Sequence, residues 1–148
     1  MKRTFSARSA GFLLAGLLLF LGGCVSYDRH DVPGRTLDGA KRFFVLSNQN
    51  DNHGIDHQVE AALKIRGLEA SVGPMTMLPD DAQVILTYDD RWEWDFGDHL
   101  IYLQFTARDR KSSQPISTVS FSAKIPKGKT TPAVVGELID RLLAGRKP

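Results

Sequence analysis

Near-strict alternation of apolar and polar residues over 84–96 constrains the fold of this chain more than any other feature. The even positions from Val84 to Phe96 are mostly apolar or aromatic, and the odd positions are mostly polar or charged. Because successive side chains of a strand point to opposite faces, this pattern predicts a strand with one buried face. Residues 99–110 and 116–125 alternate in the same way, with Gly97-Asp98 as a hairpin-type link and a second turn at 111–115. The three segments therefore predict an antiparallel meander.

Two further segments have apolar residues at the spacing of a helix face. These residues are Ile55, Val59, Ala62 and Leu63 in the first segment and Val135, Leu138, Ile139 and Leu142 in the second. Asp51 or Asn52 can cap the first helix, and Thr131 followed by Pro132 is typical of the start of the second. Short apolar runs at 42–47 and 68–72 predict two additional strands.

The resulting order is β-α-β-β-β-β-α. It predicts an α+β fold in which a mostly antiparallel four- to five-stranded sheet carries two helices on one face. We expect residues 42–148 to form a single α/β-sandwich domain, which is long enough to bury one core. The chain has one cysteine, so an intrachain disulfide is excluded.

The first 23 residues are expected to be a secretory signal peptide. Lys2, Arg3 and Arg8 precede an apolar run from Gly11 to Leu21, and small residues follow it. The run is shorter than the roughly 20 apolar residues that a membrane-spanning helix needs. Without this leader, 16 basic and 17 acidic residues remain, because three of the 19 basic residues lie in the leader.

The sequence Leu21-Gly22-Gly23-Cys24 resembles the lipobox of bacterial lipoproteins. The resemblance implies cleavage before Cys24, a diacylglycerol on its thiol, and a lipid anchor that is effectively permanent once two or more chains are present. The pair Cys24-Val25 is similar to that of lipoproteins sent to the outer membrane, which face the periplasm. Residues 24–41, rich in turn-forming residues, then predict a lipidated cysteine and a flexible tether. The alternative is that Cys24 is an ordinary small residue of a secretory leader.

The mature sequence has no basic patch that would indicate nucleic acid, and no motif for a cofactor, a nucleophile or a phosphate loop. We therefore expect a non-catalytic protein without a cofactor, whose partners are the membrane, through its lipid, and an envelope protein. The order of elements is also similar to that of the lipopolysaccharide-assembly lipoprotein that plugs an outer-membrane barrel. That resemblance is one of pattern only, and it carries no residue roles.

His53 and His57 have helical spacing for two metal ligands, but no third ligand accompanies them, so we expect a solvated helix start and no metal. Asp90 interrupts the apolar face of its strand and needs a hydrogen-bond donor, such as Arg108 or a helix end. The candidate partner or ligand surface consists of Trp92, Trp94, Leu100 and Tyr102, with Ile85 on the second sheet face. Either an envelope protein binds there, or a glycan or lipid binds the Trp92–Trp94 region. Their alternation in phase with Val84 favours a structural role for both tryptophans.

Overall fold

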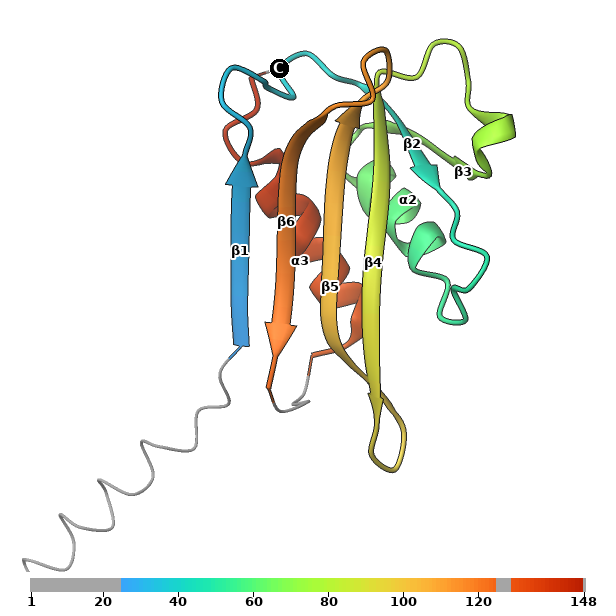
Figure 1. Ribbon diagram of the computed structural model, residues 1–148, viewed down its shortest axis with the longest axis vertical. Coiled ribbons are helices and arrows are strands. Elements are labelled where there is room, and N and C mark those ends of the chain that lie inside the picture. The colour runs from blue at the N-terminus through green and yellow to red at the C-terminus, as the bar shows by residue number, and fades with distance from the viewer. Residues whose placement is uncertain (1–24, 125–128, 148) are drawn as a thin grey trace, which may run out of the picture.

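The computed structural model describes residues 25–124 and 129–147. Six strands form one sheet, and two α-helices pack on it (Figure 1). The elements in chain order are β1 (Val25–Asp31), β2 (Arg42–Leu46), α2 (Ile55–Ile65), β3 (Glu69–Gly73), the 3-10 turn η1 (Met75–Met77), β4 (Val84–Trp94), β5 (Asp98–Asp109), β6 (Pro115–Ala123) and α3 (Thr131–Leu143).

The sheet has the strand order β1-β6-β5-β4-β2-β3. The pairs β1–β6, β6–β5 and β5–β4 are antiparallel, whereas β2 lies parallel to both β3 and β4. Two crossover connections produce the parallel pairs: α2 connects β2 to β3, and the segment with η1 connects β3 to β4 on the other side of β2, each returning the chain in the same direction. The α+β class, the two helices and the mainly antiparallel pairing agree with the sequence prediction, but the sheet is mixed and has six strands rather than four or five.

The additional strand is β1, at residues that the sequence assigns to a flexible tether. All seven residues from Val25 to Asp31 pair with β6. Further along the predicted tether, Leu37 and Ala40 are buried in the core. Residues 25–41 are therefore part of the folded domain. The prediction failed because β1 is an edge strand with mostly exposed side chains, so it lacks the alternation by which the other strands are recognised.

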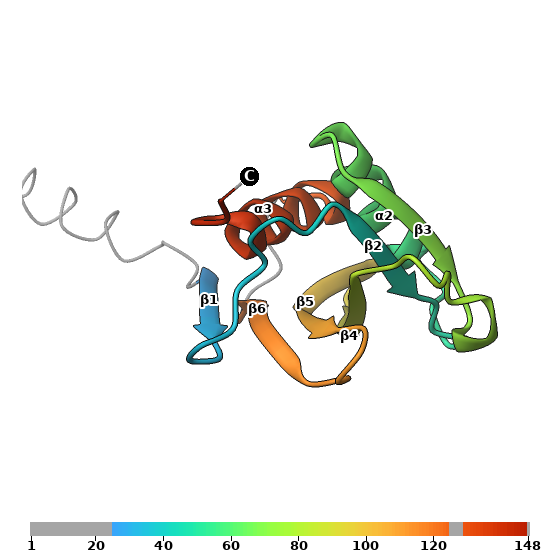
Figure 2. The same ribbon diagram turned by 90° about the horizontal axis from the view of Figure 1, so that it is seen from above.

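Both helices lie on the same face of the curved sheet, as Figure 2 shows. Their apolar stripes pack against the inward side chains of β2, β4, β5 and β6 in one core. The fully buried members include Val45, Ile55, Val59, Leu63, Leu86, Leu103, Phe105, Val119, Leu138 and Ile139. Arg66 joins the helices, since its guanidinium pairs with Asp140 and donates to the Gly136 carbonyl of α3.

Among the residues that the structure describes, no α-helix lies on the opposite face of the sheet, and we call it the helix-free face. Near β2 and β3 it is apolar, with Phe44 and Ile85 buried, and η1 packs there at Gly73. Across the other four strands it is polar, and its side chains stand in cross-strand rows. The rows are Ser26, Ser122, Tyr102 and Arg91; Asp28, Ser120, Gln104 and Asp89; and His30, Thr118, Thr106 and Thr87.

Candidate functional site at the β4–β5 hairpin

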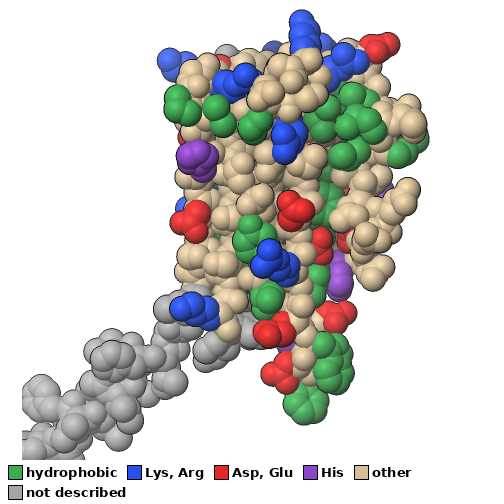
Figure 3. Space-filling model, viewed as in Figure 1, with side chains coloured by type: hydrophobic (Ala, Val, Ile, Leu, Met, Phe, Trp, Pro, Cys, Tyr) green, Lys and Arg blue, Asp and Glu red, His purple; other side chains and the backbone are tan. Residues whose placement is uncertain are grey.

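The hairpin of β4 and β5 projects beyond the rest of the sheet (Figure 1). Hydrophobic side chains gather at its end, with acidic side chains beside them (Figure 3). Trp94 is 74% exposed and Phe96 is 97% exposed, and their ring centroids lie 6.4 Å apart. We call residues 94–97 the hairpin tip. Exposed aromatic side chains of this size at one projecting point are typical of a contact surface.

The backbone of the tip differs from the expected two-residue link. Trp94 pairs with Asp98, so three residues form the turn. Phe96 has a φ of +52°, in the left-handed region that bulky side chains rarely adopt. The turn is closed by a hydrogen bond from the Asp95 amide to the Gly97 carbonyl at 3.0 Å. A large aromatic residue therefore occupies a position where glycine or asparagine would be less strained.

Trp92, at the base of the hairpin, has a structural role. Its indole ring stacks on the His53 imidazole with centroids 3.5 Å apart and planes 11° apart. Its Nε1–H donates a hydrogen bond to the Asp90 carboxylate. The donor that Asp90 requires is therefore Trp92 and not the expected Arg108. His53 Nε2 lies 3.3 Å from an Asp98 carboxylate oxygen on the facing strand. The ring of Trp92 is thus partly covered, and of the two tryptophans only Trp94 is exposed at the tip.

Asp51 fixes the loop that brings His53 to this position. Its carboxylate accepts hydrogen bonds from the amides of His53 and Ile55 at 2.8 and 2.6 Å, and from the Tyr88 hydroxyl at 2.8 Å. Burial opposes its charge, but these hydrogen bonds outweigh the burial and lower the pKa of Asp51. Burial, reinforced by the Asp51 charge, raises the pKa of Tyr88. The N-cap position of α2 is Gly54, and of the two predicted capping residues it is Asp51 whose carboxylate accepts the Ile55 amide at the helix start. Asp51 also joins the loop to β4 through Tyr88.

The structure divides the four residues predicted as one surface: Trp92 and Leu100 lie together, whereas Trp94 is at the tip and Tyr102 is on the other face. A register shift after Arg91 pairs Trp92 with Leu100 and leaves Ile101 without a partner on β4. Leu100 consequently packs with Trp92 against the core. Tyr102 lies on the helix-free face. There the Arg91 guanidinium covers its ring, and the Gln104 side-chain oxygen accepts a hydrogen bond from its hydroxyl. A single inserted residue in β5 explains this separation, since it exchanges the faces of the side chains beyond it.

Two hollows of about 330 Å³ each adjoin β1. The first lies beside the hairpin base, where Val25, Trp92, Leu100 and Phe121 line it together with Lys129. It therefore adjoins the residue that follows Cys24 in the chain.

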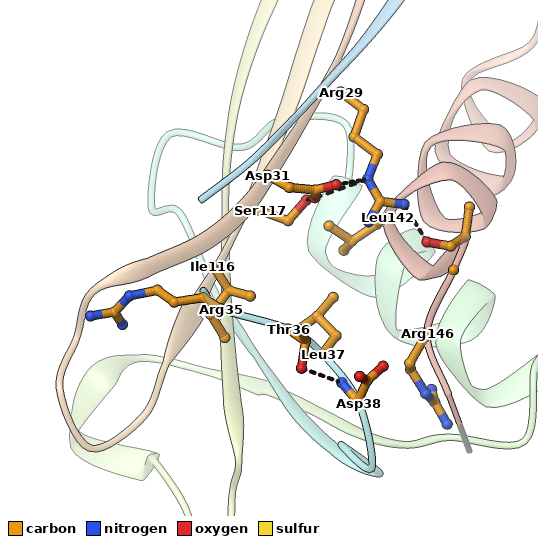
Figure 4. A pocket seen from close by; sticks show the side chains of 12 residues that line it. Arg29, Asp31, Arg35, Thr36, Leu37, Asp38, Ile116, Ser117, Leu142 and Arg146 are labelled. Atoms are coloured by element: carbon orange, nitrogen blue, oxygen red, sulfur yellow. Dashed lines mark hydrogen bonds and ion pairs between the residues drawn. The ribbon is translucent and has the colours of Figure 1, made fainter. Parts of the chain in front are cut away.

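The second hollow lies at the opposite end of β1 and contains a network of ionic contacts (Figure 4). The Arg29 Nε–H lies 2.8–2.9 Å from both oxygens of Asp31, and its Nη1 donates to carbonyls at the end of α3. The Ser117 hydroxyl also donates to Asp31, at 2.6 Å. Burial opposes the charge of Asp31, but these donors lower its pKa. The polar groups satisfy one another, so this network holds β1 against α3.

The described residues contain no cluster of three or more metal-ligating side chains. His57 pairs with Glu60, away from His53. Within residues 25–124 and 129–147, no helix is long and apolar enough to cross a membrane. Cys24, the predicted lipidation site, lies outside the described residues.

No family model matches the sequence, and no curated protein matches it. Two structures of the PelC dodecamer from Paraburkholderia phytofirmans, one of them a variant, resemble this chain with a TM-score of 0.57 and 13% identity. The similarity covers 82% of this chain and 95% or 96% of those chains. It shows a shared fold: a mixed sheet with both helices on one face.

Two proteins of Acinetobacter baumannii also match. TolB gives a TM-score of 0.47 at 16% identity, over 82% of this chain and 32% of TolB. A minor lipoprotein gives 0.38 at 13% identity, over 71% of this chain and 89% of its own. These scores are too low to carry a structural argument. The lipopolysaccharide-assembly resemblance gains no support from them.

Proposed function

We propose that this chain is a lipid-anchored, non-catalytic assembly module of a bacterial cell envelope. In this proposal Cys24 holds it on the periplasmic side of the outer membrane, and the helix-free face binds an envelope protein or a second copy of the chain. The proposal joins the lipobox at residues 21–24 to the fold of the residues that follow.

The observation that carries the proposal is that the sheet begins directly after the lipobox cysteine. Val25 is the first residue of β1 and already pairs with Ala123. Consecutive Cα atoms lie about 3.8 Å apart, so a lipid on Cys24 would be attached at the edge of the domain. Such an anchor holds the whole domain against the bilayer and limits the orientations in which it can present a surface.

The helix-free face is the surface that this arrangement would present. Its polar part spans four strands, and half of the residues in its cross-strand rows are serine or threonine. Short side chains lose little conformational entropy on binding, and a polar composition fits a non-obligate interface better than a permanent one. PelC, which shares the fold, is described as a dodecamer, and this supports the idea that the fold can serve in assembly.

The test is native mass spectrometry of the lipidated protein extracted in mild detergent. We expect either several copies or a stoichiometric complex with one protein, lost in the double variant Gln104→Arg and Ser120→Arg. The matched control, Ala61→Arg with Ala133→Arg, adds the same two charges on exposed positions of α2 and α3 and should retain the complex. A monomer under all conditions, or a complex that survives the double variant, would overturn the proposed interface.

A glycan ligand at the hairpin is the second candidate function. It is favoured by one observation, the exposure of Trp94 beside the carboxylates of Glu93 and Asp95. Aromatic faces stack on sugars only when they are exposed, which Trp94 satisfies and Trp92 does not. Titration of Trp94 fluorescence with envelope oligosaccharides tests this candidate, and no change at saturating sugar would exclude it.

A further inference from the structure

The aromatic residues of the hairpin tip lie outside the core and contribute little to its packing. Trp94 and Phe96 are exposed, and Phe96 also adopts a left-handed backbone conformation. A residue of this kind with φ above zero is strained and persists where it serves something other than local folding. Two large apolar rings held at a projecting turn therefore indicate an apolar environment outside the domain.

The tip lies at the same end of the sheet as the start of β1 (Figure 1). Ser26 pairs with Ser122, Ser122 pairs with Tyr102, and Tyr102 pairs with Arg91, so these residues lie at one level across four strands. Trp94 is three residues beyond Arg91, which places it about 10 Å beyond this level at about 3.3 Å per residue.

Cys24 is two residues before Ser26, so it can reach at most about 7 Å beyond the same level. The lateral separation is three strand spacings, because β6 and β5 lie between β1 and β4. At about 4.8 Å per spacing, the lipid attachment point and the tip are about 14 Å apart. A bilayer surface that receives the lipid of Cys24 would therefore meet Trp94 and Phe96 as well.

The chemistry of the tip suits the interfacial layer of a bilayer. Tryptophan is enriched at this depth because its ring is apolar and its indole N–H is polar. Glu93, Asp95 and Asp98 flank the aromatic pair and oppose deeper insertion, since a carboxylate in the hydrocarbon core is costly. These charges also favour zwitterionic over anionic headgroups. The amphipathic tip therefore matches the headgroup layer.

We propose that the hairpin tip, through Trp94 and Phe96, is a second membrane contact that works together with the lipid of Cys24. This inference rests on the proposed lipid anchor. The acyl chains supply the affinity, and the tip supplies orientation, because two contacts about 14 Å apart restrict tilting of the domain. The strands then stand upright on the bilayer and the helix-free face is presented sideways to a partner.

The test uses the lipidated full-length mature protein in vesicles of phosphatidylcholine and phosphatidylethanolamine, with and without bromine near the top of the acyl chains. Trp92→Phe leaves Trp94 as the only tryptophan of the two, and Trp94→Phe leaves Trp92 as the matched control. We expect bromolipid to quench Trp94 strongly and Trp92 weakly, and vesicles to shield Trp94 from iodide. The difference between wild-type protein and Trp94→Phe gives the Trp94 signal independently, should Trp92→Phe fold poorly.

The outcomes separate this inference from the proposed function. If the protein floats with the vesicles while Trp94 is not quenched by bromolipid and stays open to iodide, the tip contact is wrong and the anchor stands. If Trp94 is shielded only when oligosaccharide is added, the tip is a glycan site and the membrane contact is overturned. If the protein does not float with vesicles, the lipid anchor fails, and the inference fails with it.

Discussion

Truncation of the two tryptophans should affect stability very differently. Trp94 is 74% exposed, so about a quarter of its surface is covered. Truncating a fully buried tryptophan costs about 3–5 kcal/mol, and a quarter of this predicts about 1 kcal/mol for Trp94→Ala. This corrects the sequence-based expectation of a structural role for Trp94.

Trp92→Ala should cost about 2–3 kcal/mol. The change removes the partly buried ring and its stack on His53, and an aromatic pair of this kind contributes about 0.5–1.5 kcal/mol. It also removes the indole donor of Asp90, and a lost hydrogen bond adds about 1 kcal/mol. These contributions overlap, so they are not simply summed.

Urea unfolding followed by circular dichroism measures both changes without relying on tryptophan fluorescence. Phe96→Ala is the matched control, because Phe96 is at the same tip and 97% exposed, and it should not lower the free energy of unfolding by more than Trp94→Ala does. Equal losses for the two tryptophan variants, or a larger loss for Trp94→Ala, would refute the assignment of Trp92 to structure and Trp94 to contact.

Three further variants test other parts of the account. Phe96→Asn should raise the free energy of unfolding by about 0.5–1 kcal/mol, because asparagine tolerates the left-handed backbone and no packing is lost. A lower free energy of unfolding would argue against backbone strain at this position. Asp51→Asn should cost about 1–2 kcal/mol at neutral pH, because neutral hydrogen bonds to the Ile55 amide and the Tyr88 hydroxyl replace charge-assisted ones. Because folding lowers the pKa of Asp51, this cost should be complete above about pH 4, near the pKa of the unfolded state, and should shrink as the pH falls through the folded-state pKa. A difference in urea midpoints that does not change with pH would contradict this prediction. Leu138→Asp should unfold the domain, because it places a charge in the buried face of α3. Ala133→Asp, at an exposed position of α3, should keep the free energy of unfolding within about 0.5 kcal/mol of the wild-type value. Equal melting temperatures for the two variants would show that the buried face of α3 is misassigned.

The elements with regular hydrophobic spacing were predictable from the sequence. Alternation from Val84 onward marks β4, and the stripe that contains Leu138 marks the buried face of α3, because each pattern reports burial of a regular element. The location of β1 was not predictable in this way. Its charged residues, such as Arg29, stabilise the strand through contacts with distant parts of the chain, namely β6 and the end of α3.

The candidate site was predicted only in part. Trp94 alternates in phase with the buried residues of β4, but the phase of a strand does not tell where the covering helices end. Phe96 was not singled out, although a bulky residue directly before a turn glycine is a signal that could have been weighed. The inserted residue at Ile101 also leaves no local pattern, since it becomes visible only through pairing with β4.

The lipid on Cys24 is the central claim, because the anchor, the orientation and the proposed partner face all depend on it. Mass spectrometry of the mature protein from the membrane fraction tests it most directly. We expect an N-terminal peptide that begins at Cys24 and carries a diacylglycerol, and we expect Cys24→Ser to yield an uncleaved or soluble product. A mature protein in the membrane fraction that lacks acyl chains, or that begins at another residue, would contradict the account.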